Sequence, residues 1–119
     1  MPVTTRSQTM AQAAYQRIAG RNNGKPTKEY ATFAKKFPAL IHTCGLAQAV
    51  AFAEAKKENT YLGDLVVVLQ AAGYRDLRNQ GVLASRSREA ELATYLRLNR
   101  DALLAAGWLK RYVEALGEN

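Results

Sequence analysis

The chain has 119 residues, 48% of them apolar and 23% charged, which is the balance of an ordinary globular protein rather than a disordered one. That length is enough for one domain, no apolar run reaches the roughly 18 residues that a membrane span needs, and a single cysteine excludes an intramolecular disulfide and fits a cytoplasmic protein. The net charge of +7 favours a polyanionic partner, or else a solvated basic surface.

The N-terminal segment predicts a helix over residues 7–19, because its apolar residues fall at helical spacing and Gly20 follows where a C-terminal cap is expected. Residues 1–6 are expected to form a flexible tail. Residues 20–25 are expected to form a basic loop. Its two glycines are separated by three residues instead of the four of a Walker phosphate loop, and Pro26 follows its lysine, so a nucleotide site is rejected.

A second helix is predicted to begin at Thr27, a plausible N-cap residue. One apolar stripe follows at helical spacing from Tyr30 to Phe37. Pro38 has no amide hydrogen for a helix interior but suits a first turn, so we expect the second helix to end there. A third helix is then predicted over residues 38–57.

The next segments predict two further helices. Residues 61–72 contain three consecutive valines, which favour a strand by propensity, but their apolar residues keep a helical period and no partner strand is evident. We therefore expect a buried helix that ends at Gly73. Residues 74–84 are expected to form a loop, and Ser85 or Ser87 is expected to cap the fifth helix.

The clearest amphipathic pattern lies in residues 101–116, which predict the last helix. A break at residues 99–101 is expected to separate it from the fifth helix. The six predicted helices and their short connections indicate an all-α bundle, one domain over residues 1–119, with 117–119 as a second tail. Alternating strands and helices are absent, so nucleotide-binding α/β folds are not expected.

The only histidine and the only cysteine, His42 and Cys44, are two residues apart. On a helix they point about 200° apart, so they cannot ligate one metal or form a nucleophile–base pair from one face. Cys44 is expected in the core and His42 at the surface, while Gly45 is expected to let another backbone approach. The acids lie mostly beside basic residues and indicate surface ion pairs. We expect no catalytic site, metal or cofactor.

The positive charge is concentrated in the first half of the chain. Residues 1–58 hold nine basic and three acidic residues, whereas residues 59–119 hold eight and seven. Within residues 15–36 there are six basic residues and one acidic residue. The aromatic residues interleaved with them are expected in the core more often than stacked on bases, so this segment predicts a surface that follows a nucleic-acid backbone without reading its sequence.

Three groups of segments together resemble a known family. They read FPALI at 37–41 followed by CGLAQAVAF at 44–52, Lys56 followed by YL at 61–62, and WLKRYVEA at 108–115. In order and spacing they are similar to the small helical subunit of the type III-B (Cmr) CRISPR effector complex, over about residues 8–116. That family typically shows Pro-x-Leu-Ile, Gly-Leu and a C-terminal Trp-Leu-Lys-Arg. One departure is Cys44, where the family often has asparagine.

The resemblance implies a non-catalytic subunit that acts in antiviral defence. Copies of the chain would stack along the backbone subunits of the Cmr complex and hold target RNA paired to guide RNA, while cleavage belongs to neighbouring subunits. Lysine and arginine contacts to phosphates would position the RNA while base pairing supplies its sequence. Arg111 could instead anchor the core or a partner subunit. The candidate RNA contacts are Arg17, Arg21, Lys25, Lys28, Lys35 and Lys36, with Lys56, Lys110 and Arg111 as second choices.

Three alternatives remain at this point. The chain could be a helical adaptor that binds only protein, with a charge that serves solubility. It could be the equivalent small subunit of a type III-A complex, which is also helical and basic. A DNA-binding helix-turn-helix protein needs a short turn before its recognition helix, and the loop over residues 21–27 is long for that.

Overall fold

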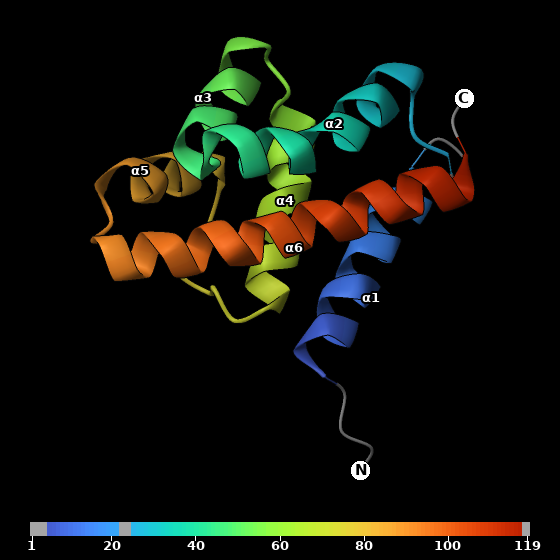
Figure 1. Cartoon of the computed structure of the whole chain (residues 1–119). Coiled ribbons are helices and arrows are strands. Elements are labelled where there is room, and N and C mark those ends of the chain that lie inside the picture. The colour runs from blue at the N-terminus through green and yellow to red at the C-terminus, as the bar shows by residue number, and fades with distance from the viewer. Residues whose placement is uncertain (1–4, 22–24, 118–119) are drawn as a thin grey trace.

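The computed structural model describes residues 5–21 and 25–117, which form six α-helices and no strand (Figure 1). None of the helices in those ranges is both long and apolar enough to cross a membrane. The predicted all-α class is confirmed. The helices are α1 (Arg6–Ala19), α2 (Lys28–Cys44), α3 (Leu46–Ala55), α4 (Asn59–Ala71), α5 (Gln80–Glu89) and α6 (Leu92–Leu116).

One cluster of buried apolar side chains, to which all six helices contribute, forms the core. The helix predicted over residues 61–72 is confirmed as α4, most of whose side chains are buried. Its end is a Schellman motif, since the amides of Gly73 and Tyr74 donate to the carbonyls of Gln70 and Leu69, both at 3.0 Å. The positive φ of Gly73, 117°, fits this role.

The expected break at Pro38 is wrong, because α2 continues through it for six more residues. A proline inside a helix costs about 3 kcal/mol through its missing hydrogen bond and its ring clash. Phe37 and Ile41, on either side of it, are fully buried in the core. Burying each of them contributes about 1.5–3 kcal/mol, which offsets that cost. The third predicted helix is therefore divided between α2 and α3 at Gly45.

Gly45 forms the corner between α2 and α3, with a φ of +85° that favours glycine. A Cβ there would lie 3.0 Å from the hydroxyl of Tyr95. The close neighbour is thus a side chain of α6 and not the backbone that we expected. Cys44 is exposed, contrary to the expectation of a core position, because α2 ends at it and the next apolar stripe starts on a new axis. His42 is exposed, as expected.

The first turn of α3 is capped by side chains of α6, because α3 has no capping side chain of its own. The Asn99 side-chain oxygen accepts a hydrogen bond from the Leu46 amide at 2.8 Å. The Tyr95 hydroxyl accepts one from the Ala47 amide at 3.2 Å. The backbone groups that a helix start leaves unsatisfied therefore hold α3 on α6.

The loop expected over residues 74–84 is shorter than predicted, because α5 begins at Gln80. Its cap is Asn79, whose side chain accepts from the Val82 amide at 3.0 Å, so neither Ser85 nor Ser87 caps it. Ser87 is buried and donates to a carbonyl of its own helix.

The break expected at residues 99–101 is also wrong. The final helix, α6, is continuous over 25 residues and crosses the width of the molecule (Figure 1). Asn99 is used to cap α3, and Asp101 is buried and ion-paired, so neither residue ends the helix.

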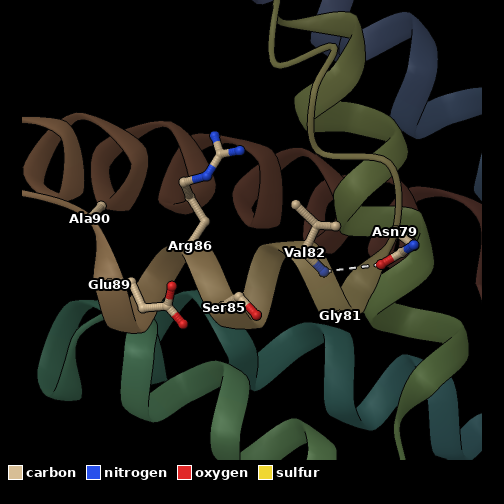
Figure 2. A pocket seen from close by; sticks show the side chains of 7 residues that line it. All are labelled: Asn79, Gly81, Val82, Ser85, Arg86, Glu89 and Ala90. Carbon is tan, nitrogen blue, oxygen red and sulfur yellow. Dashed lines mark hydrogen bonds between the residues drawn. The ribbon is translucent and has the colours of Figure 1, made fainter.

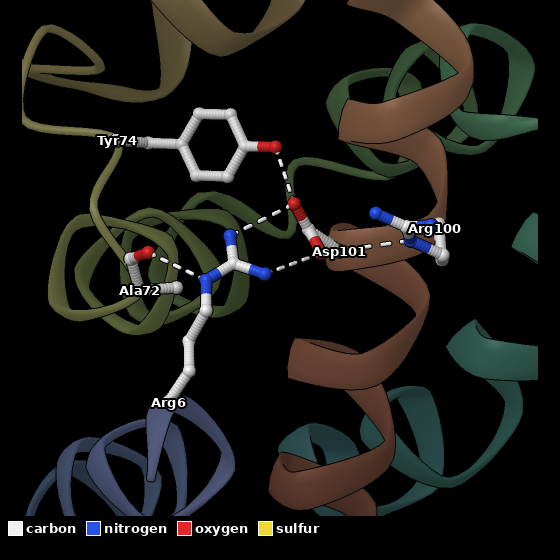
Figure 3. Close-up of polar contacts among 5 residues, drawn as sticks. All are labelled: Arg6, Ala72, Tyr74, Arg100 and Asp101. Carbon is white, nitrogen blue, oxygen red and sulfur yellow. Dashed lines mark hydrogen bonds and ion pairs between the residues drawn. The ribbon is translucent and has the colours of Figure 1, made fainter.

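Asp101 is 1% exposed and binds Arg6, the first residue of α1 (Figure 3). The two terminal nitrogens of Arg6 donate to the two carboxylate oxygens, both at 2.9 Å, and its Nε donates to the carbonyl of Ala72 at 2.8 Å. The Tyr74 hydroxyl donates to the same carboxylate. This network joins α1, the end of α4 and α6. Arg6 is therefore part of the fold, whereas residues 1–4 of the predicted tail lie outside the described residues.

Burial opposes ionisation of Asp101, but the hydrogen bonds from Arg6 and Tyr74 outweigh it and hold the pKa of this carboxyl below its usual value. Burial, together with this carboxylate, raises the pKa of Tyr74, so its hydroxyl keeps the proton that it donates. Because the folded pKa of Asp101 is lower than the unfolded one, its contribution to stability is complete above about pH 4 and is lost as the pH falls through the folded value.

Replacing Asn99 by alanine should lower the free energy of unfolding by about 1–2 kcal/mol, since it removes the acceptor for an α3 amide. Urea unfolding followed by circular dichroism measures this. The control is Asn59→Ala, at an exposed position in the first turn of α4, which should change stability by less than about 0.5 kcal/mol. Equal effects of the two substitutions would contradict the capping role.

Replacing Asp101 by asparagine should destabilise the protein by about 1–3 kcal/mol at pH 7, because charge-assisted hydrogen bonds are removed. The difference from the unmodified protein should shrink as the pH falls from 5 to 2, where Asp101 becomes protonated. Unfolding free energies across that range test this. Asp76→Asn, in an exposed pair with Arg86, is the control. The hydrogen bond from Arg86 lowers the pKa of Asp76 too, but water screens this exposed pair, so the control should change the pH profile in the same direction by a much smaller amount. A difference in unfolding free energy between the Asp101→Asn variant and the unmodified protein that stays constant down to pH 2 would contradict the stabilising role of the ionised carboxylate.

Candidate nucleic-acid interface

The nine candidate residues divide between two regions of the structure. Seven lie along the end of α1, the connection to α2, α2 itself and the end of α3, and the other two lie in α6. The five candidate lysines of the first half are all exposed. Lys110 is half-buried and Arg111 is exposed, so Arg111 does not anchor the core.

Arg17 and Arg21 are directed to Asp64, a carboxylate of α4 with no exposed surface. The Nε of Arg17 donates to one carboxylate oxygen at 2.8 Å, and Arg21 donates to the same oxygen. The hydroxyl of Tyr30 donates to the other oxygen. Arg21 also donates to the carbonyl of Arg17 at 3.0 Å. These two candidates therefore bind α1 to α4, and contact between them and RNA stays a prediction.

Asp64 and Asp101 were both missed by the sequence reasoning, which placed the acids on exposed faces. The sequence signal for Asp64 was its position inside the apolar run from Leu62 to Val66, because a charged side chain in such a run is expected to be buried with the helix. Such a carboxylate needs cationic and hydrogen-bonding partners when it is buried. The basic residues of α1 supply them, which sequence spacing alone does not reveal.

Three of the four aromatic residues interleaved with the basic segment pack inward, as predicted, whereas the fourth, Tyr15, is 47% exposed. Tyr30, Phe33 and Phe37 are buried and surround Tyr61, with ring centroids 4.9–5.7 Å from its ring. Burial and the Asp64 carboxylate raise the pKa of Tyr30, so its hydroxyl remains a donor. These rings are core, and a base-stacking platform made from them is excluded.

Two lysines from different elements come together over one half-buried ring, that of Phe52. The Nζ of Lys36, on α2, lies 5.4 Å from the centroid of this ring, and the Nζ of Lys56, just after α3, lies 5.7 Å from it. Lys36 also lies 5.6 Å from the Phe33 ring. The ring face attracts both ammonium groups. The result is a concentrated positive patch, the Phe52 lysine pair (Lys36 and Lys56), which sequence spacing did not single out.

The described part of the surface has several shallow hollows. One, of about 490 Å³, runs along α5, and Figure 2 shows Arg86 pointing away from Ser85 and Glu89 within it. Arg86 pairs with Asp76 at 2.8 Å. In the described part of the chain, no three His, Cys, Asp or Glu side chains are grouped as a metal site would need.

Comparisons with known proteins match nearly the whole chain. A family model described as CRISPR-associated protein (Cas_Cmr5) matches residues 6–116, the span of the six helices. A curated relative, CRISPR system Cmr subunit Cmr5 of Thermus thermophilus, is 43% identical over 114 residues, 96% of this chain and 97% of the relative. The X-ray crystal structure of a CRISPR-associated Cmr5 family protein, also from Thermus thermophilus, matches with a TM-score of 0.84 and 43% identity, over 97% of this chain and 100% of that chain.

The double variant Arg17→Met with Arg21→Met should lose more unfolding free energy than the two single variants lose when their losses are added together. Either arginine alone leaves Asp64 one cation, whereas the double variant leaves a buried carboxylate with only tyrosine, at a cost of about 3 kcal/mol or more. Urea unfolding of the four proteins measures the coupling. The control pair is Arg75→Met and Arg78→Met, at exposed positions, which should add independently. Additive losses at Arg17 and Arg21 would show that Asp64 does not depend on both.

Proposed function

This chain belongs to the Cmr5 family of CRISPR-associated proteins, the small subunit of the type III-B (Cmr) complex, and from that premise we propose that it contacts the RNA of the complex through a basic surface and performs no catalysis of its own. The match favours this assignment over the equivalent type III-A subunit. The proposal places the protein in the cytoplasm, in antiviral defence, with the other Cmr subunits, copies of itself, guide RNA and target RNA as partners.

The α1–α3 basic surface consists of Arg17, Arg21, Lys25, Lys28, Lys35, Lys36 and Lys56. The observation that best supports RNA contact is the Phe52 lysine pair, since the exposed side chains of Lys36 and Lys56 bring two ammonium groups to within 5.4 and 5.7 Å of the centroid of one ring. Lys28 is exposed at the start of the same helix as Lys36. Ammonium groups act on phosphates as point charges without reading sequence, which suits a subunit whose target is chosen by base pairing.

The absence of catalysis is supported by the positions of His42 and Cys44. Both are exposed near the end of α2, and they are two residues apart on one helix, so they face different directions. Among the described residues, neither His42 nor Cys44 is grouped with two further His, Cys, Asp or Glu side chains. No histidine lines the hollow along α5. Cleavage of RNA would then belong to neighbouring subunits.

Stacking of copies would allow a small basic patch on each copy to be enough for RNA binding by the whole complex. Each copy would contribute a few phosphate contacts, and linked weak sites act together with a high effective concentration. Binding by the isolated chain is therefore expected to be weak, and the assembled complex is the proper object of the test.

Changing Lys28, Lys36 and Lys56 to glutamate should weaken RNA retention by the assembled complex. The slope of log affinity against log salt should fall by about 0.7–0.9 for each phosphate that is no longer neutralised. Filter binding of labelled RNA across a salt series measures both quantities. Copurification of the variant with the other subunits, and an unchanged thermal midpoint, establish that assembly and folding are intact.

The matched control reverses three exposed arginines outside the α1–α3 basic surface, Arg75, Arg78 and Arg97, also to glutamate. Its net charge change is the same, so a general electrostatic effect would lower binding equally in both variants. Unchanged affinity and slope in the lysine variant, with assembly intact, would contradict RNA contact and favour the helical adaptor that binds only protein.

A further inference from the structure

One long face of α6 carries apolar side chains that nothing in the described chain covers. Leu92, Leu96 and Leu104 are 72%, 56% and 51% exposed, and all three lie on this helix. Figure 1 shows α6 crossing the molecule with no helix over its near side. Towards its C-terminal end a groove of about 730 Å³ runs past Leu104, Gly107 and Arg111, which are among the residues that line it. Exposed apolar surface of this kind marks an interaction site.

No close neighbour within the described chain requires a glycine at position 107. It lies in the interior of α6, where glycine is the least favourable residue after proline. A Cβ placed on it would meet nothing within 4 Å, so the fold itself would accept a side chain there. A glycine opening into a groove allows the backbone of another helix to approach closely. The groove therefore fits a helix that crosses α6 at Gly107.

Two opposite charges lie symmetrically about that glycine. Arg100 is seven residues before it and Glu114 is seven residues after it, and positions seven apart on a helix differ by only about 20° around the axis. Both side chains are exposed, and that of Arg100 is 69% exposed with only a loose 4.0 Å approach to Asp101. The three residues therefore form one line along the open face of α6.

This line is complementary to itself when reversed. In an antiparallel pair of α6 helices that cross at Gly107, Arg100 of each copy lies opposite Glu114 of the other. In a parallel pair, like charges would face each other. We propose that two copies of this chain associate through antiparallel α6 helices about a two-fold axis at Gly107, with Leu103 and Leu104 packed in the shared groove.

The contact would be isologous and would close on itself, since both copies use the same surface. It is thus distinct from open-ended stacking in the complex. The overlap of the two helices about Gly107 covers residues 98–116, about 28 Å of helix, and leaves Leu92 and Leu96 outside the contact. A contact of this length is at the small end of specific interfaces, so dissociation should fall in the micromolar range or above. No lysine of the α1–α3 basic surface lines the groove, so this proposal is independent of the proposed function.

Sedimentation equilibrium of the full chain across a concentration series tests the association. The first variant is Gly107→Gln, which should raise the thermal midpoint, because helix propensity improves, while weakening dimerisation about tenfold or more. The control is Gly63→Gln, at a helical glycine of α4 that also has open space and lies outside the groove. It should leave dimerisation unchanged. A purely structural glycine would move the midpoint and not the association.

The second test is a charge exchange that fixes the register. Arg100→Glu alone and Glu114→Arg alone should each weaken dimerisation about tenfold, and the two together should restore it to within about threefold. A monomer at every concentration, an association that ignores Gly107→Gln, or a double exchange weaker than either single change would overturn the proposal. Because RNA retention is measured on other residues, failure here leaves the proposed function untouched.

Discussion

Two buried carboxylates, Asp64 and Asp101, determine how the N-terminal helix lies on the rest of the molecule. Only three side chains of α1 are buried, so apolar packing alone gives this helix little to hold it. Arg6 at one end and Arg17 and Arg21 at the other bind acids of α4 and α6 that have essentially no access to water. A buried carboxylate without such partners destabilises the folded state. Detaching α1 from α4 and α6 would therefore leave both carboxylates without their cations.

This constraint bears directly on the proposed function. The arginines of α1 and of the connection after it are committed to buried acids, Arg6 to Asp101 and both Arg17 and Arg21 to Asp64, while the neighbouring lysines of α2 and α3 remain at the surface. The charge of the N-terminal half therefore divides into a part that holds the fold and a part that faces solvent. The Phe52 lysine pair belongs to the second part, and it arises only because α2 and α3 meet at Gly45.

Much of the fold follows from local patterns in the sequence. Helical periodicity located α1, α4 and the C-terminal part of α6, and it identified the aromatic residues of α2 as core. The errors came where tertiary contacts override local preference. Pro38 is tolerated because its neighbours Phe37 and Ile41 are buried, and α6 passes through residues 99–101 because Asn99 caps another helix and Asp101 meets an arginine from α1. No spacing rule connects residue 6 to residue 101, so the ion pairs became visible only in three dimensions.

Photochemical crosslinking of the assembled Cmr complex to its RNA, followed by mass spectrometry of the crosslinked peptides, tests most directly whether this subunit contacts RNA through the α1–α3 basic surface. The account predicts crosslinks in the segments that carry Lys28, Lys36 and Lys56. Crosslinks confined to α5 and α6, or none to this subunit while neighbouring subunits react, would contradict it.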